Sequence, residues 1–210
     1  MKLLSITLFL SIAAACNSTA QRRGSEEVKI DPSPKKSVAA FAEGCFWCSE
    51  HIFEELAGVD SVVSGYAGGH TANPTYEEVC TEKTGHAETV LIYYNPQIIS
   101  YPQLLDVFFS SHDPTTLNRQ GPDVGSSYRS AIFYLNEDQK KAAEDAIRKW
   151  TPAFKNLIVT QVAPLKKFYR AEEYHQNYAH QNPYDSYIRN VSTPRFESFK
   201  RQCKLEFKKK

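Results

Sequence analysis

The sequence VAAFAEGCFWCSEHIF, residues 38–53, decides the fold around the reactive part of this chain. Its first five residues are small or apolar and predict a short buried strand, which Gly44 ends by supplying a turn. Apolar residues then recur at helical spacing, as at Ile52 and Leu56. The stretch therefore predicts a strand, a tight turn and a helix, with Cys45 at or near the helix N-terminus.

Cys45 and Cys48 form a thiol pair one helical turn apart. Unpaired N–H groups at a helix N-terminus favour a thiolate, so we expect the pKa of Cys45 to lie below its ordinary value of about 8.5. Cys48 falls within the Cα separation of about 4.4–6.8 Å that a disulfide requires. Phe46 and Trp47 add two large rings beside the sulfur. The pattern indicates thiol chemistry on a small apolar group, while a buried structural pair or half of a zinc site also fits the tetrapeptide.

Length and composition predict one globular domain with terminal extensions. The chain has 210 residues, of which 41% are hydrophobic and 23% charged, values typical of a single domain with a sizeable core. A formal net charge of +1 argues against a nucleic-acid partner. We expect the domain to span residues 37–194.

Residues 1–16 have the pattern of an export signal. Lys2 is followed by an apolar run that is too short to span a bilayer, and then by three alanines and Cys16. This resembles a bacterial lipoprotein signal, in which Cys16 is lipidated and tethers the protein to the periplasmic face of a membrane, although Ala13 stands where such signals usually have Leu. A plain secretory signal cut near Ala15, giving a soluble periplasmic protein, is the alternative. Residues 17–36 are polar and predict a flexible tether.

Strands and helices alternate irregularly along the domain, which favours an α+β fold. Further strands are predicted over residues 59–66, 87–94, 129–135 and 157–163, and helices from Ser100 and Asn136. The long polar loops between them are typical of functional segments. Residues 195–210 hold seven Lys/Arg against two Asp/Glu, a net +5, and predict a solvated basic tail.

Six segments of the chain resemble peptide methionine sulfoxide reductase A, in that family's order. They are GCFW (44–47), GYAGG (65–69), PTYEEVC (74–80), TGHAE (84–88), HDPTTLNRQGPDVGSSYRS (112–130) and AEEYHQNY (171–178). The resemblance covers about residues 37 to 190. It implies a two-layer α/β sandwich with a mixed, mainly antiparallel sheet of ferredoxin-like type, and reduction of the S epimer of methionine sulfoxide, free or in oxidised proteins.

The resemblance also implies roles for single residues. Cys45 is the nucleophile that attacks the sulfoxide sulfur, and Glu88 is the proton donor to the sulfoxide oxygen. A poor leaving oxygen needs such an acid, with a raised pKa, within hydrogen-bond reach. The rings that enclose the substrate methyl group are those of Phe46 and Trp47. The remaining polar wall consists of Tyr76, Asp123 and Tyr128.

Recycling of the enzyme needs a second thiol, because attack leaves Cys45 as a sulfenic acid that condenses with a nearby thiol. Many relatives have Gly at position 48 and use cysteines near the C-terminus, whereas this chain has both Cys48 and Cys203. We expect Cys48 to resolve the sulfenic acid, and Cys203 either to take over the disulfide or to be a bystander. Cys80 is interpreted as a buried structural thiol. Thioredoxin or another dithiol is the expected electron donor. We expect no bound cofactor and a monomeric enzyme.

Two other classes of protein remain as alternatives. A thiol–disulfide oxidoreductase would use Cys45 and Cys48 but would leave Glu88 and the tyrosines without a task. A zinc-binding module would use Cys45, Cys48 and Cys80, for which no fourth ligand at a suitable spacing is evident. The six histidines show no paired ligand spacing and are interpreted as hydrogen-bonding groups of loops, so no metal site is expected.

Overall fold

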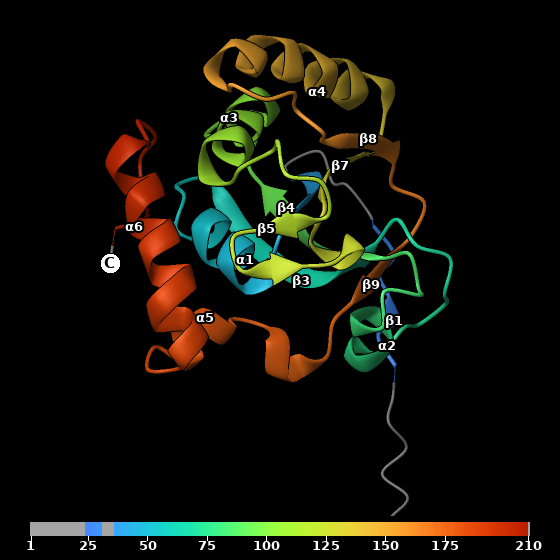
Figure 1. The fold of residues 1–210 in the computed structure, drawn as a ribbon. Coiled ribbons are helices and arrows are strands. Elements are labelled where there is room, and N and C mark those ends of the chain that lie inside the picture. The colour runs from blue at the N-terminus through green and yellow to red at the C-terminus, as the bar shows by residue number, and fades with distance from the viewer. Residues whose placement is uncertain (1–23, 31–35, 210) are drawn as a thin grey trace, which may run out of the picture.

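A curled, mostly antiparallel sheet forms the centre of the molecule in the computed structural model, which describes residues 24–30 and 36–209 (Figure 1). Within these residues the sheet has seven strands, in the order β1-β9-β3-β4-β2-β7-β8. The described neighbours pair antiparallel except β7 and β8, which are parallel. The strands are β1 (Glu26–Glu27), β2 (Ser37–Glu43), β3 (Val59–Ala67), β4 (Ala87–Tyr94), β7 (Ser130–Tyr134), β8 (Gln161–Pro164) and β9 (Phe168–Arg170).

Helices and a small second sheet surround this centre. The α-helices are α1 (Phe46–Glu54), α2 (Tyr76–Cys80), α3 (Tyr101–Ser111), α4 (Glu137–Trp150), α5 (Tyr178–Gln181) and α6 (Thr193–Gln202). A two-stranded sheet pairs β5 (Arg119–Gln120) with β6 (Asp123–Val124). Short helical turns of other types are η1 (Ser126–Tyr128), η2 (Thr151–Ala153), η3 (Glu173–His175) and η4 (Ile188–Ser192). The predicted α+β class and mainly antiparallel sheet are confirmed.

The strand, turn and helix predicted around Gly44 are present as β2, Cys45 and α1. Gly44 has φ +91°, and a Cβ there would lie 2.6 Å from the Gln120 side chain, so both backbone and space require glycine. The predicted caps are also confirmed. Ser100 forms a capping box with Gln103 at the start of α3, and Asn136 caps α4.

Both faces of the sheet are covered by apolar side chains. One face carries the main core, in which residues of β2 and β4 pack against α1, α3 and α6. The other face carries small residues, such as Ala40, Ala42 and Ala87, around Phe133 and Phe168. Burial on both faces holds β2 and β4 in place; β2 leads to Cys45, and Glu88 lies at the start of β4.

Both predicted terminal extensions are partly wrong. The tether predicted over 17–36 does not extend through residues 24–30, because β1 pairs with β9 and Ser25 is buried. The basic tail predicted over 195–210 is a packed element: α6 buries Phe196 and Phe199, and the backbone of Lys208 donates to that of Glu55. The sequence signal for α6 is the helical spacing of Phe196 and Phe199 among charged residues. A count of charges over the segment does not reveal this spacing.

Two further differences concern strands. The segment predicted as a last strand over 157–163 forms β8 from Gln161 onward, and β9 follows it. β9 has only three residues and is held by pairing with β3, which short-range patterning does not reveal. The predicted signal at 1–16, with Cys16, lies outside the described residues.

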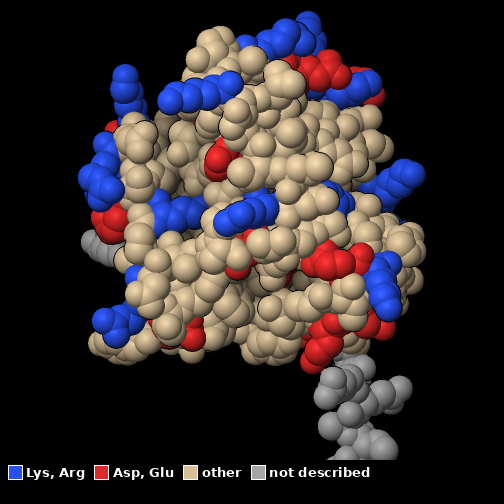
Figure 2. All heavy atoms as spheres, viewed as in Figure 1, with Lys and Arg blue, Asp and Glu red and all other residues tan. Residues whose placement is uncertain are grey.

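Charges of both signs are distributed over the visible surface. Figure 2 shows basic side chains over α4 and along α6, and acidic ones gathered near α2, whose first turn carries Glu77 and Glu78. No helix in the described part of the chain is long and apolar enough to cross a membrane.

Candidate active site

Cys45 lies at the N-cap of α1, where β2 delivers it through the turn at Gly44. Its carbonyl accepts hydrogen bonds from the backbone N–H of Cys48, at 3.1 Å, and of Ser49, at 3.3 Å. These bonds hold the two cysteines in one helical turn. Both thiols are buried and free. The predicted thiol pair at a helix N-terminus is therefore present.

Glu88 is placed beside this turn by β4. Its Oε2 accepts a hydrogen bond of 3.0 Å from the backbone N–H of Phe46, the first residue of α1. The side chain is almost fully buried, and burial is the main reason why its pKa is raised to about 8; the Phe46 bond acts in the opposite direction. Glu88 is therefore a protonated acid near neutral pH, as the sequence analysis requires.

The two predicted substrate rings lie in an aromatic cluster. Trp47 stacks on Tyr178 at 3.9 Å between ring centroids, and its Nε1–H donates to Nδ1 of His175 at 3.1 Å. Phe46 contacts the same His175 ring at 5.0 Å. Burial lowers the pKa of His175 to about 4, so the ring is neutral and can accept this bond. His175 and Tyr178 therefore hold the Trp47 ring in place.

Carboxylates position the two predicted tyrosines. Glu172 accepts from the backbone N–H of Tyr76 at 2.9 Å, and from the hydroxyl of Tyr66 at 3.0 Å. Glu82 accepts from Ser126 and Ser127 of η1, the turn that ends at Tyr128. The pKa values of both Tyr76 and Tyr128 are raised, first by burial and next by the charge of Glu88, so both phenols remain protonated.

Asp123 reaches the thiol pair through a tyrosine that sequence reasoning missed. Tyr187 donates its hydroxyl to Asp123 Oδ2 at 2.5 Å, and the same hydroxyl lies 3.9 Å from Sγ of Cys48. Its ring also meets Trp47 edge-on at 5.9 Å. Tyr187 lies in a segment with no recognisable motif, between α5 and η4, so only tertiary folding places it here.

The two thiols have opposite pKa shifts. Burial, followed by the adjacent Cys48, raises the pKa of Cys45 well above its usual value, contrary to the lowering expected from its helix position. The hydrogen bond from Cys45 is the main cause that lowers the pKa of Cys48 to about 6, and Arg195, Ser192 and Tyr187 act in the same direction. Desolvation of Cys45 outweighs the partial charge of the helix N-terminus. Because the two thiols are coupled, these shifts describe the pair: one of its two protons is lost more readily than that of an ordinary thiol, and the other is held more firmly.

A buried ion pair lies behind Cys48. Arg195, from α6, donates to Glu43 Oε1 at 2.6 Å and to the backbone carbonyl of Ser111 at 2.8 Å. Burial raises the pKa of Glu43 to about 7, although Arg195 opposes this shift. Nδ1 of His112 is 3.7 Å from the same carboxylate and lies within 2.7 Å of the Phe108 carbonyl. The positive charge of Arg195 lowers the pKa of Cys48, a role that the charge count of the predicted tail did not reveal.

Cys80 and Cys203 lie elsewhere. Cys80 ends α2 and is exposed, so its interpretation as a buried structural thiol is wrong. Cys203 is the C-cap of α6, eight residues beyond Arg195, which corresponds to about 12 Å along a helix. A disulfide between Cys203 and Cys45 would therefore require the end of α6 to move. Cys48 needs no such movement.

In the described residues, one group of three or more side chains could hold a metal ion, and this group contains no cysteine. The group is His51, Glu55 and His180, at the opposite end of α1 from Cys45. Cys45, Cys48 and Cys80 therefore do not converge as the zinc-module alternative requires.

This arrangement can perform cysteine-based reduction by two electrons, since two thiols lie in one helical turn and a buried acid bonds to the start of the same turn. The fold and site define a thiol-dependent oxidoreductase. Residues 37–207 match the protein family Peptide methionine sulfoxide reductase, and the chain belongs to this family.

Known relatives support the assignment. The peptide methionine sulfoxide reductase MsrA of Pasteurella multocida is 52% identical over 158 residues, covering 75% of this chain and 91% of that protein. Among solved structures, methionine sulfoxide reductase A of Corynebacterium diphtheriae is similar with a TM-score of 0.70 and 35% identity, covering 73% of this chain and 78% of that one. Mxr1 from Saccharomyces cerevisiae, solved in complex with Trx2, has a TM-score of 0.50 and 30% identity over 72% of this chain and 91% of that one. The chain is a peptide-methionine (S)-S-oxide reductase.

Proposed function

We propose that Cys45 is the nucleophile and Glu88 the acid of this reductase. In the first step the Cys45 sulfur attacks the sulfoxide sulfur, and its proton passes to the Cys48 thiolate. The sulfoxide oxygen receives the proton of Glu88 and ends on Cys45 as a sulfenic acid. The substrate sulfur gains two electrons, Cys45 loses two, and methionine leaves. The tyrosine hydroxyls of Tyr76 and Tyr128 share the stabilisation of the oxygen as its negative charge develops.

Phe46 and Trp47 enclose the substrate methyl group in this proposal. The neutral ring of His175 fixes the indole of Trp47 from one side, and Tyr178 covers one of its faces. An apolar ring wall beside the reactive sulfur favours methionine sulfoxide over smaller polar sulfoxides.

Cys48 is the resolving thiol. Its sulfur attacks Sγ of the Cys45 sulfenic acid, the S–O bond breaks, and the hydroxyl leaves as water after protonation. The Tyr187 hydroxyl accepts from Cys48 and donates to Asp123, so it is placed to take up the Cys48 proton as the sulfur attacks and to give a proton to the departing oxygen, which leaves Tyr187 unchanged. Two thiols from a dithiol donor then reduce the Cys45–Cys48 disulfide.

The observation that carries the proposal is the hydrogen bond from the first N–H of α1 to Glu88, because it fixes a buried acid beside the helix turn that holds both thiols. The test is turnover of the two methionine sulfoxide epimers, free and in oxidised protein, with dithiothreitol. Reduction of the S epimer alone is expected. Equal turnover of both epimers would reject the proposed site geometry.

A thioredoxin-like protein is the proposed physiological donor. The yeast relative forms a complex with Trx2, and a dithiol protein suits reduction of a disulfide whose two sulfurs lie in one helical turn. The test compares turnover with thioredoxin, thioredoxin reductase and NADPH against a monothiol such as glutathione. Turnover supported by the monothiol alone would exclude this donor class.

Export is proposed from residues 1–16, with lipidation at Cys16 or, in the alternative, cleavage near Ala15. The support is the sequence Lys2, apolar run, three alanines and Cys16. Expression in a bacterium with labelled fatty acid distinguishes the two. Label lost in Cys16→Ser supports lipidation, and an unlabelled chain beginning at residue 16 supports plain secretion.

The fold is proposed to be a two-layer α/β sandwich of ferredoxin-like type, as the resemblance implies. The support is the succession β2, α1, β3, β4, α3, β7, with these four strands adjacent in the order β3-β4-β2-β7. We further propose a monomer, which size-exclusion chromatography with light scattering would test.

A further inference from the structure

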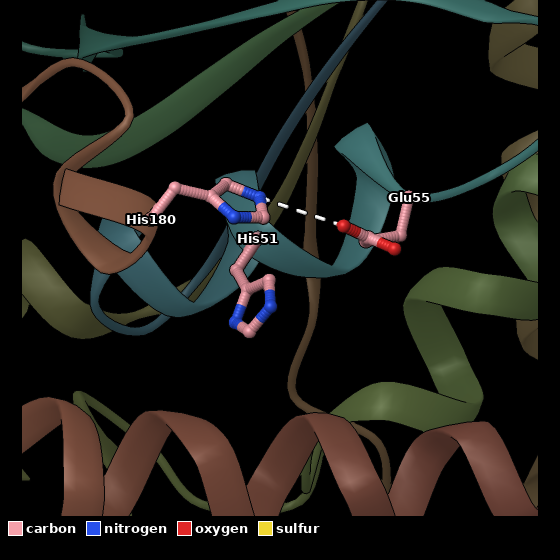
Figure 3. Close-up of side chains that lie close together, drawn as sticks. All are labelled: His51, Glu55 and His180. Atoms are coloured by element: carbon pink, nitrogen blue, oxygen red, sulfur yellow. Dashed lines mark ion pairs between the residues drawn. The ribbon is translucent and has the colours of Figure 1, made fainter. Parts of the chain in front are cut away.

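Three potential metal ligands converge at the end of α1 remote from the thiols. His51 and Glu55 are separated by four residues and therefore share one side of the helix. His180 extends toward them from α5, as Figure 3 shows. One ligand atom from each of the three side chains lies within 4.8 Å of the other two.

The distances are close to those of a coordinated ion. His180 Nε2 is 3.6 Å from Glu55 Oε1 and 3.8 Å from Glu54 Oε2. In a tetrahedral zinc site with metal–ligand bonds of about 2.0–2.1 Å, neighbouring ligand atoms are about 3.3 Å apart. Rotamer adjustments of about 1 Å would therefore bring the ligands onto one ion, without movement of α1 or α5.

The surroundings hold these side chains in place. The His51 ring stacks on Phe196 of α6 at 4.3 Å and meets the His180 ring edge-on at 5.0 Å. The Glu55 side chain is only 12% exposed, and that of His180 is 41% exposed, so the group is open to solvent at His180. Two carboxylates, Glu54 and Glu55, face His180, and the charge of Lys208 also acts on Glu54.

We propose that His51, Glu55 and His180 form a binding site for a divalent first-row transition ion, with zinc as the best fit. Two imidazoles and one carboxylate are the ligand set that zinc accepts, whereas calcium and magnesium prefer oxygen ligands alone. Glu54 or water completes the fourth position. The reduction proposed above uses thiols and a carboxylic acid, so this site is additional to it.

Binding would join two elements that both reach the reactive site. Helix α1 begins directly after Cys45 and carries Trp47 and Cys48 in its first turn, and α5 carries Tyr178, which stacks on Trp47. A metal bridge between His51 and His180 would fasten α5 onto α1 and hold this stacked pair. The expected physical effect is a more stable folded state when zinc is present.

The test must separate this site from zinc bound by the thiols. We would titrate the Cys45→Ser/Cys48→Ser chain with zinc in competition with a chromogenic chelator. The prediction is one equivalent per chain, with affinity reduced at least about tenfold by His180→Ala and by Glu55→Gln, since even loss of an outer hydrogen-bonding partner costs 10–100-fold. His70→Ala, which removes an exposed loop histidine, is the matched control and should bind zinc normally.

Two further readouts keep the test decisive. Zinc should raise the Tm of the Cys45→Ser/Cys48→Ser chain but not the Tm of the same chain with His180→Ala. The His180 side chain is exposed, so we expect its removal to leave the fold intact. Cobalt bound to the wild-type chain should give a spectrum without sulfur-to-metal charge transfer. Absence of binding, or binding that both variants retain, would show that His180 merely pairs with the two glutamates and would overturn the proposal.

Discussion

The backbone N–H of Phe46 donates to Oε2 of Glu88, which joins the start of α1 to β4 across 42 positions of sequence. Because Phe46 follows Cys45, this bond sets the position of the acid relative to the nucleophile. It also occupies one carboxyl oxygen and leaves the other to carry the acid proton. The predictions below follow from this arrangement and from the groups around it.

Replacing Cys45 with serine should abolish reduction of the S epimer. An alcohol cannot supply a thiolate, and Cys48 lies one turn behind the position from which attack occurs. The measurement is methionine release in a single turnover, with circular dichroism to establish that the fold is retained. Substantial release from this variant would transfer the nucleophilic role to another thiol.

Glu88→Gln should lower the rate of methionine release by about 10²–10⁴, the range for general acid catalysis. Because the pKa of Glu88 is raised to about 8, the acid form is present below that pH and is lost as pH rises through it. The wild-type single-turnover rate should therefore fall above about pH 8, and the variant should lack this alkaline limb. An alkaline limb that persists in Glu88→Gln would assign the acid role to another group, with Asp123 the first to test.

Cys48→Ser should still release about one methionine per enzyme, because Cys45, Glu88 and the ring wall remain, but should not recycle with thioredoxin. Cys203→Ser should be much milder, since Cys203 lies at the far end of α6. Mass spectrometry of wild-type enzyme after one turnover identifies the bridge. A dominant Cys45–Cys203 disulfide, with Cys48 free, would reverse the proposed order.

Tyr187→Phe should slow formation of the disulfide more than release of methionine. The lost hydroxyl contacts Cys48 and Asp123, and a hydrogen bond to a charged group contributes about 1.5–3 kcal/mol, so a decrease of about tenfold or more is expected. Loss of free thiols after mixing with substrate measures the step. Tyr184→Phe, at a ring that is 88% exposed, is the matched control and should behave as wild type. Equal slowing of both steps would indicate a general structural effect.

Arg195→Met should destabilise the fold by about 3–5 kcal/mol, because it leaves Glu43 buried without its charged partner. Urea unfolding at pH 8 measures the change, since Glu43, with a pKa of about 7, is then mostly ionised. Arg201→Met, on the exposed side of the same helix, should change stability by less than about 0.5 kcal/mol. Glu43→Gln in the Arg195→Met background should restore part of the loss. Similar effects of the two arginine variants would contradict a specific buried pair.

Local sequence determined the elements whose signals lie within a few residues. The buried strand before Gly44, the helix after Cys45 and the caps at Ser100 and Asn136 all depend on backbone preferences and burial periodicity, which neighbouring residues express. The order of six motifs was enough to assign the family and to name Cys45, Phe46, Trp47 and Glu88. These residues lie in or beside regular elements, so their placement follows once the elements form.

Only the tertiary structure decided the contacts between distant segments. The pKa of Cys45 depends on how deeply the pair is buried, and desolvation there outweighs the helix end that the sequence indicates. Tyr187 and Arg195 approach Cys48 because α6 and η4 pack on α1, and His180 meets His51 because α5 does the same. These contacts depend on long-range packing of apolar faces. The spacing of residues along the chain does not show which polar groups this packing brings together.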